Sequence, residues 1–298
     1  MSEKLAPGLY LVATPIGNLG DITLRALEVL KQADRIACED TRQTQKLLNH
    51  FAITTPTTSY HQHNERQRAT ELVDSLKAGA RIAVVSDAGM PGISDPGSWL
   101  VSAAIAAGLP VIPIPGANAA LSALVASGFS TEQFHFHGFL PEKAGARRSC
   151  LEDLAAQPRD SAQTLIFHEA PHRIADTLGD LESVFGPALR VVAARELTKL
   201  HEEFLRGTVS EVRRDLATRD RIRGEFTLLI EAPPHSATNS GAPGLDSQTW
   251  ESISAKIARL KSESNLDEKE ALKRLAREMG QSKSELYREL QRERARRK

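Results

Sequence analysis

Short apolar runs alternate with amphipathic segments over the first 232 residues of the chain. The apolar runs are rich in β-branched side chains, and the segments between them repeat apolar positions every three or four residues. Strands that alternate with helices in this way predict βαβ units and a mostly parallel sheet. The predicted strands are 9–13, 35–39, 81–85, 110–114, 133–139, 163–168, 189–196 and 224–232, and the clearest predicted helices are 22–33, 41–51, 65–79, 98–108 and 117–128.

Changes in this pattern divide the chain into four predicted parts. Two α/β domains, 1–117 and 118–232, come first. Pro, Gly, Ser and Thr replace large apolar side chains over 233–249, which predicts a flexible linker. Residues 250–298 are helical in pattern, and their last part resembles a helix-turn-helix in which Ala276 packs inside and Gly280 turns the chain. The expected fold is therefore α/β, with two domains and a small helical module.

Charge is balanced overall but unevenly distributed. The chain carries 38 basic and 38 acidic side chains, whereas the helical module has an excess of Lys and Arg. A basic tail on an acidic body favours a polyanionic partner, although a solvated polar helix face gives the same pattern. No apolar run is long enough for a membrane span, and the N-terminus does not have the form of a signal peptide. The two cysteines, Cys38 and Cys150, have no disulfide or metal spacing, which predicts a reducing, cytoplasmic location.

Two glycine-rich loops follow predicted strands, namely TPIGNLGDITL (14–24) and SDAGMPGISDPG (86–97). Ligands of open parallel sheets bind at the carboxyl ends of strands, where both loops begin. Glycine lets the main chain approach a ligand closely, so that its peptide groups can bind an adenosine while a carboxylate faces a ribose or a positive centre. Each loop alone could be a long connecting turn. Neither has the dinucleotide or P-loop spacing of glycines.

Three clusters mix acidic and basic side chains at predicted strand ends: EDTR (39–42), HEAPHR (168–173) and RELTK (195–199). Local salt bridges and helix caps would explain each cluster alone, but their shared location favours a site. The letters HEAPH also match the zinc-protease motif. That motif needs both histidines on one helix, whereas His168 ends a predicted strand and Pro171 disfavours a continuous helix, so we predict no metal site here. The pairs HQH (61–63) and HFH (135–137) are better explained as satisfied or exposed histidines.

Several of these segments together resemble the tetrapyrrole-methylase superfamily, and within it the branch that methylates small-subunit ribosomal RNA. The resemblance spans about 9–232 and rests on VATPIGNLGDITLRALEVLKQADRIACEDTR (12–42), SDAGMPGISDPG, IPIPGANA (112–119), HGFLP (137–141), FHEAPHR (167–173) and RELTKLHEE (195–203). It implies two α/β domains with S-adenosylmethionine (SAM) in the cleft between them, and a homodimer. It also implies methyl transfer to the ribose 2′-oxygen of a decoding-centre cytidine in 16S rRNA, on the assembled small subunit.

A 2′-hydroxyl is a poor nucleophile that benefits from a base or from stabilisation of the developing oxyanion, and the resemblance implies which residues bind the cofactor. Glu169 is the first candidate for a general base, and Lys199 or Arg42 would hold ribose or phosphate. The residues expected to bind the cofactor are Pro15, Asp87, Ala88, Gly89, Ile93, Ser94, Ala117, Asn118, Phe167, His168, Ala170, Phe226 and Thr227.

Three other functions would explain parts of the sequence. A methyltransferase acting on a precorrin or uroporphyrinogen would share the fold, but it would not need a basic helical tail. A DNA-binding regulator that senses a nucleotide-like ligand would explain the helix-turn-helix pattern, but not the acid–base clusters at the strand ends. A zinc hydrolase is the weakest alternative.

Overall fold

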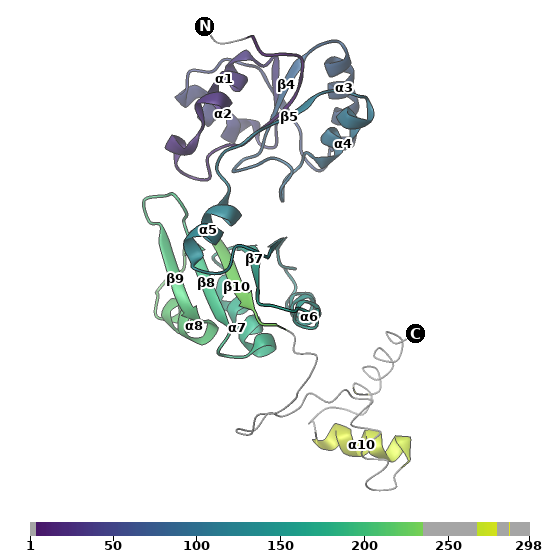
Figure 1. The fold of residues 1–298 in the computed structure, drawn as a ribbon, viewed down its shortest axis with the longest axis vertical. Helices are drawn as coiled ribbons and strands as arrows, with labels where there is room; N and C mark the ends of the chain where they lie inside the picture. Colours follow the sequence, from purple (N-terminus) through teal and green to yellow (C-terminus); the bar gives the residue numbers. More distant parts are fainter. Residues whose placement is uncertain (1–3, 235–266, 279–285, 287–298) are drawn as a thin grey trace. The chain divides into compact units, whose positions relative to one another are not determined.

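The computed structural model describes residues 4–234, 267–278 and 286. The chain divides into two compact units, Met1–Thr238 and Asn239–Lys298. The first unit contains two five-stranded sheets with helices between the strands (Figure 1), which confirms the predicted α/β class. Its strands are β1 Gly8–Val12, β2 Arg35–Cys38, β3 Thr57–Ser59, β4 Arg81–Val85, β5 Val111–Ile114, β6 Phe134–Phe139, β7 Gln163–Glu169, β8 Arg190–Arg195, β9 Glu203–Thr208 and β10 Phe226–Ala232. Its helices are η1 Leu19–Asp21, α1 Leu24–Gln32, α2 Thr41–His50, α3 Glu65–Lys77, α4 Ser98–Ala106, α5 Ala119–Ser127, α6 Ala144–Ala155, α7 Ile174–Phe185 and α8 Val209–Ala217.

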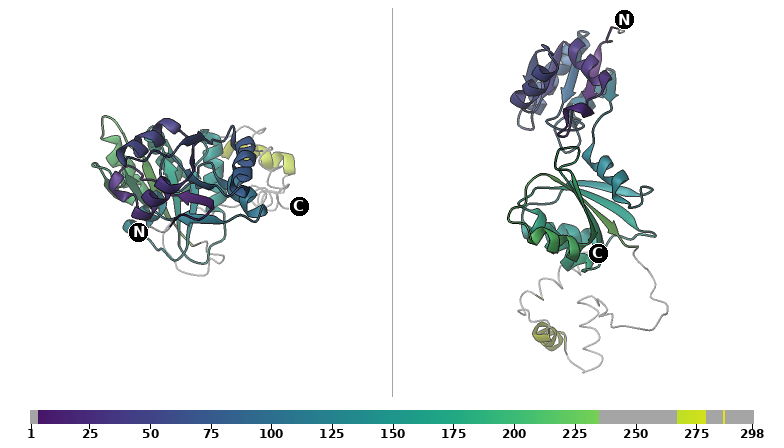
Figure 2. Two further views of the ribbon diagram at one scale, coloured as in Figure 1. Left: turned by 90° about the horizontal axis from the view of Figure 1, so that it is seen from above. Right: turned by 90° about the vertical axis from the view of Figure 1, so that its left-hand side faces the viewer.

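The first sheet has the order β3-β2-β4-β1-β5, and all its strands are parallel. Successive side chains of a strand point to opposite faces, and both faces are covered. In β4, Ala83 and Val85 pack with α1 and α2, whereas Ile82 and Val84 pack with α3 and α4. The two helix pairs lie on either side of the sheet (Figure 1, Figure 2). Because its strands are all parallel, they all end at the same edge of this sheet.

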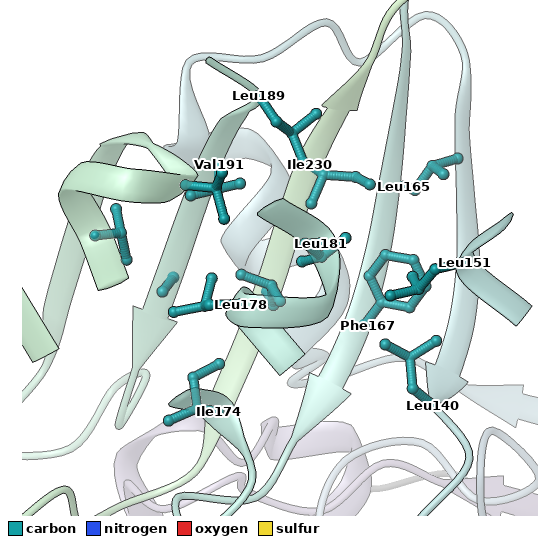
Figure 3. Packing of buried hydrophobic residues seen from close by; sticks show 14 of the residues in the cluster. Leu140, Leu151, Leu165, Phe167, Ile174, Leu178, Leu181, Leu189, Val191 and Ile230 are labelled. Carbon is teal, nitrogen blue, oxygen red and sulfur yellow. The ribbon is translucent and has the colours of Figure 1, made fainter. Parts of the chain in front are cut away.

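The second sheet is mixed, with the order β6-β7-β10-β8-β9. Only β6 and β7 are parallel, and the other neighbours are antiparallel. Helices α6, α7 and α8 cover one face, where Phe167 packs among leucines such as Leu151 and Leu178 (Figure 3). Helix α5 packs on the other face through Ala123 and Leu124.

Two strands were not predicted from the sequence. β3 is three polar residues long, too short for an alternating pattern to reveal it, and it pairs with β2 at the sheet edge. β9 lies in a polar segment that we had not assigned to any element, and it forms an antiparallel pair with β8.

The predicted linker 233–249 lies almost entirely outside the described residues. Within the predicted helical module 250–298, the structure describes helix α10, Glu268–Glu278, and Leu286. Ala271, Leu272 and Leu275 of α10 are buried. Gly280 and the side chain of Ala276, on which the helix-turn-helix prediction depends, lie outside the described residues. Among the helices that are described, none has the length and apolar character needed to cross a membrane.

Candidate functional site

The two glycine-rich loops are joined by main-chain hydrogen bonds. Thr14 N–H donates to Gly89 O at 2.9 Å and Gly89 N–H donates to Thr14 O at 3.1 Å. The Thr14 hydroxyl also donates to Ser86 O at 3.1 Å. Gly89 has φ +81°, a conformation that side chains disfavour, and a Cβ built there would lie 3.4 Å from Ile16 Cγ2. Glycine is thus favoured here because the main chain adopts a left-handed turn where it bonds to the first loop.

These loops form one wall of a cavity of about 540 Å³ within the first unit. This volume lies in the range of small-molecule and cofactor sites. The other wall comes from the second sheet and from the start of α5. The lining residues are Ile16, Asp87, Ala88, Gly89, Met90, Ile93, Ser94, Asp95, Asn118–Ala120, Phe136, Phe139, His168–His172, Ala194, Leu197, Lys199 and Glu225–Thr227.

Most residues predicted to bind the cofactor line this cavity. Pro15, Ala117 and Phe167 are not among the lining residues. Pro15 is buried directly before Ile16. Phe167 points into the core, because neighbouring residues of β7 face opposite sides of the sheet (Figure 3). The predicted residues that do line it are Asp87, Ala88, Gly89, Ile93, Ser94, Asn118, His168, Ala170, Phe226 and Thr227.

Glu169, the candidate base, ends β7 at the cavity but has a fully buried side chain. It accepts hydrogen bonds from the Thr177 hydroxyl at 2.7 Å and from the Ala170 N–H at 2.9 Å. The Arg173 guanidinium lies 3.1 Å from the same carboxylate. The carboxylate therefore has three polar neighbours, and the cluster HEAPHR is in part an internal ion pair.

Lys199 lines the cavity from the turn that follows β8. Its Nζ donates to Glu196 at 2.8 Å and to Glu225 at 3.0 Å. Partial burial disfavours its charge, but these two hydrogen bonds prevail and raise the pKa of Lys199. A Cβ built on Gly17 would lie 2.4 Å from Lys199 Cε, so the stem of this side chain packs on the first glycine-rich loop. Lys199 is thus a cation that connects the two walls.

Arg42, the third candidate, is exposed at the start of α2 and is not among the lining residues. The Asp40 carboxylate beside it caps α2 by accepting from the Arg42 N–H at 2.8 Å. The cluster EDTR therefore supplies a helix cap. Thr23 likewise caps α1 by accepting from the Ala26 N–H at 3.1 Å.

An aromatic patch surrounds His168 on the second wall. The rings of Phe136 and Phe139 lie 5.0 and 5.6 Å from the His168 ring, centroid to centroid. Regular alternation would place these two phenylalanines on opposite faces of β6, but the strand is irregular between Phe136 and Gly138, where Gly138 has φ +65°. Burial lowers the pKa of His168, which is therefore a neutral imidazole at pH 7.

Carboxylates gather on the first wall. Burial, together with the nearby Glu39 and Asp87, raises the pKa of Asp95 to about 6. Burial also raises the pKa of Glu39 and of Asp87. Asp87 Oδ1 accepts from the Asp40 N–H at 3.3 Å and so connects the loops that follow β2 and β4. This wall is suited to a ligand with a positive centre or with hydroxyl donors.

The HEAPH segment does not have the geometry of a zinc-protease motif. His168 belongs to β7, whereas His172 lies in the turn before α7. The two imidazoles are therefore not one helical turn apart, as that motif requires. Among the described residues, no group of three His, Cys, Asp or Glu side chains is arranged to hold a metal ion.

Comparison with known proteins agrees with this architecture. Residues 8–213 match the family model described as Tetrapyrrole (Corrin/Porphyrin) Methylases. The chain belongs to this family. Among curated family members, it is 49% identical over 281 residues to the ribosomal RNA small subunit methyltransferase I of Halalkalibacterium halodurans, covering 94% of this chain and 93% of that protein. It is 53% identical over 222 residues to the protein of the same name from Synechocystis, covering 74% of this chain and 78% of that protein.

Solved structures share the tetrapyrrole-methylase fold. The uroporphyrin-III C-methyltransferase of Thermus thermophilus has a TM-score of 0.53 and 19% identity, over 76% of this chain and 94% of that chain. The methyltransferase CobJ has a TM-score of 0.55 and 19% identity, over 79% and 97% of the two chains. The family match over residues 8–213 confirms the expected superfamily, and these structures share its fold.

Several cavity residues were not predicted from the sequence. Asp95 and Met90 belong to the quoted loop, and their position beside its glycines could have indicated them. Phe136 and Phe139 depend on the irregularity of β6, which nothing in the sequence HFHGF reveals except its glycine. The remaining unpredicted lining residues are Ile16, Ala119, Ala120, Pro171, His172, Ala194, Leu197 and Glu225.

Proposed function

We propose that the chain is a SAM-dependent methyltransferase that acts on ribosomal RNA of the small subunit. The observation that carries this proposal is a cofactor-sized cavity whose glycine-rich wall lies inside the matched family region. The relatives named ribosomal RNA small subunit methyltransferase I support the substrate class, since they match most of the chain. A solved relative of the same fold, a uroporphyrin-III C-methyltransferase, is complexed with S-adenosyl homocysteine, which supports the cofactor.

The residues of the first wall fit SAM in size and charge. The left-handed turn at Gly89 leaves space that a side chain would fill, so the main chain at Ala88 and Gly89 can contact an adenosine. The Asp87 and Asp95 carboxylates suit a positively charged ligand. SAM, when bound, supplies an electrophilic methyl group on a sulfonium centre. The contribution of the chain is to orient the acceptor oxygen and to exclude water.

The acceptor in this proposal is the ribose 2′-oxygen of a decoding-centre cytidine in 16S rRNA, on the assembled subunit. A 2′-hydroxyl is a weak nucleophile, so it gains from a group that accepts its proton or stabilises the developing charge. Lys199 is held as a cation by Glu196 and Glu225, which supports a role in stabilising the developing negative charge. Glu169 stays a predicted base, although it would have to accept a proton while bonded to Thr177 and Arg173. Arg42 stays a predicted phosphate contact, because its guanidinium is exposed outside the cavity.

A homodimer in the cytoplasm completes the proposal. Leu121 and Val125 lie one turn apart on α5 and expose 47% and 76% of their surface. Such neighbouring apolar side chains are typical of surfaces that bind another protein chain. Cys38 and Cys150 are free thiols, which supports a reducing compartment.

The test is methyl transfer from labelled SAM to unmodified small subunits, with deproteinised 16S rRNA and a tetrapyrrole mixture in parallel. The RNA is then digested to nucleosides. Label in 2′-O-methylcytidine from the subunit is the expected result. Label only in a tetrapyrrole would overturn the RNA substrate and favour the chemistry named for the solved relatives. Binding of SAM without any transfer would favour a ligand-sensing regulator.

A further inference from the structure

Three helices begin at the edge of the first sheet where the cavity lies. Helices α2, α3 and α4 follow the parallel strands β2, β3 and β4. Their second residues are Arg42, Arg66 and Trp99. Because parallel strands all end at one edge, these helices begin at the same edge as the cavity loop that joins β4 to α4, with α2 on one face of the sheet and α3 and α4 on the other. We call Arg42, Arg66 and Trp99 the edge strip.

Trp99 is an unusual residue to find on this surface. It exposes 48% of its area, although large aromatic side chains are mostly buried. The Arg66 guanidinium lies over its ring, 4.8 Å from the centroid. An exposed indole beside a guanidinium offers two flat surfaces that can stack on a nucleobase, and the guanidinium adds a positive charge for a phosphate.

The guanidinium groups of the edge strip are available for a ligand. Within the part of the chain that the structure describes, no carboxylate lies within ion-pair distance of Arg42 or Arg66. Arg190 on the second sheet is different, although it also lies over an aromatic ring. It is paired with Glu231 at 2.9 Å, and its partner Phe129 is buried. Arg190 is therefore a matched control for an arginine–aromatic pair that is already satisfied.

Charge changes sign from the cavity to the edge strip. Asp87 and Asp95 line the cavity, with Glu39 close enough to Asp95 to raise its pKa, whereas Arg42 and Arg66 are exposed and are not among the lining residues. The carboxylates of the first wall repel a polyanion, whereas the guanidinium groups of the strip attract it. Phosphates of a bound strand would then stay outside while one sugar enters, which is the arrangement that chemistry on a ribose requires.

We propose that the edge strip binds single-stranded RNA, with a base adjacent to the target nucleotide stacked on Trp99 and Arg66, and with Arg42 contacting a phosphate. This inference rests on the proposed function and specifies how that substrate is held. Single-stranded RNA fits better than a duplex, because stacking on a protein side chain requires an unstacked base.

The test uses the full-length protein and the variants Trp99→Ala, Trp99→Phe, Arg66→Ala, Arg42→Ala and Arg190→Ala. Two quantities are measured, the Kd for a single-stranded RNA with the target sequence and the KM for the subunit. Loss of base stacking at Trp99→Ala should weaken RNA binding about tenfold, and Trp99→Phe should restore most of it. Arg66→Ala and Arg42→Ala should each reduce the slope of log Kd against log salt by about 0.7. The Kd for SAM, and all values for Arg190→Ala, should not change.

The binding measurement separates this inference from the proposed function. If the wild type methylates RNA but all three alanine variants of the strip bind RNA as the wild type does, the edge strip is not the RNA-binding surface. The proposed function would then still stand. If RNA binding depends on Trp99 but no methyl transfer occurs, the edge strip binds RNA and the proposed methyltransferase function is wrong. Unchanged RNA affinity for Trp99→Ala, together with a shift from dimer to monomer in sedimentation, would show that this surface joins two copies of the chain instead.

Discussion

The two walls of the cavity are built in different ways. The first-sheet wall is main chain, in which Thr14 and Gly89 bond to each other and glycine leaves the peptide groups close to the ligand space. The second-sheet wall consists of side chains held in ionic networks, with Glu169 bonded to Thr177 and Lys199 bonded to Glu196 and Glu225. The first wall should therefore be sensitive to the addition of any side chain, and the second to the loss of one partner.

The largest expected loss of folding stability follows a substitution in the second-sheet wall. Glu169→Ala leaves the Arg173 guanidinium, mostly buried, without its carboxylate, and breaking such a pair costs about 3–5 kcal/mol. Urea unfolding should show this loss of stability.

Glu169→Gln separates structure from catalysis, because the amide keeps the shape. The neutral amide still leaves Arg173 without its negative partner, so Glu169→Gln should lose stability but stay folded; if Glu169 is the base, its kcat should fall about a hundredfold or more. Nearly full kcat in folded Glu169→Gln would show that the carboxylate is structural.

The next effect is on the first wall. Gly89→Ala forces a side chain into φ +81° and into contact with Ile16, which should cost about 1–3 kcal/mol and weaken SAM binding at least tenfold. Gly79→Ala is the control, because Gly79 has φ +90° but nothing within 4 Å of a built Cβ. Both variants should lose similar stability, measured by thermal unfolding. If calorimetry shows equal SAM affinity for the two, the wall does not contact the cofactor.

The sequence revealed the first wall more completely than the second, for a physical reason. Glycines, a proline-stiffened loop and a buried strand before it are local signals, so Asp87, Ala88, Gly89, Ile93 and Ser94 were predicted together. The second wall depends on contacts between distant residues. Nothing near Lys199 indicates that Gly17 packs against it, and nothing near Phe139 indicates that an irregular strand turns it toward His168. For the same reason, the fold class could be predicted while the short edge strand β3 could not.

A smaller effect should appear where the two walls meet. A Cβ on Gly17 would collide with the stem of Lys199, so Gly17→Ala should displace Lys199 from Glu196 and Glu225. In a Lys199→Ala background the collision disappears and only backbone strain remains. A double-mutant cycle on unfolding free energy should give a coupling of about 1 kcal/mol. Gly79→Ala with Lys199→Ala should be additive, and additivity for the Gly17 pair as well would mean that the two walls are energetically independent.

The smallest expected change in stability concerns Asp95, a charged side chain on the first-sheet wall. The pKa of Asp95 is raised to about 6, above its value in an unfolded chain, so the ionised carboxylate is less stable in the folded protein. This penalty is fully present above pH 6 and disappears as the pH falls toward the ordinary aspartate range, because the folded chain then binds the proton more tightly than the unfolded chain.

Asp95→Asn should therefore be more stable than the wild type at pH 7.5, by about 1 kcal/mol after allowing for solvent screening, and the difference should vanish near pH 4. Thermal unfolding across this range measures it. A gain that persists at pH 4 would point to packing instead of charge. A gain at neutral pH accompanied by weaker SAM binding would explain why the chain keeps an unfavourable carboxylate, because an active site commonly sacrifices stability for the charge that its ligand requires.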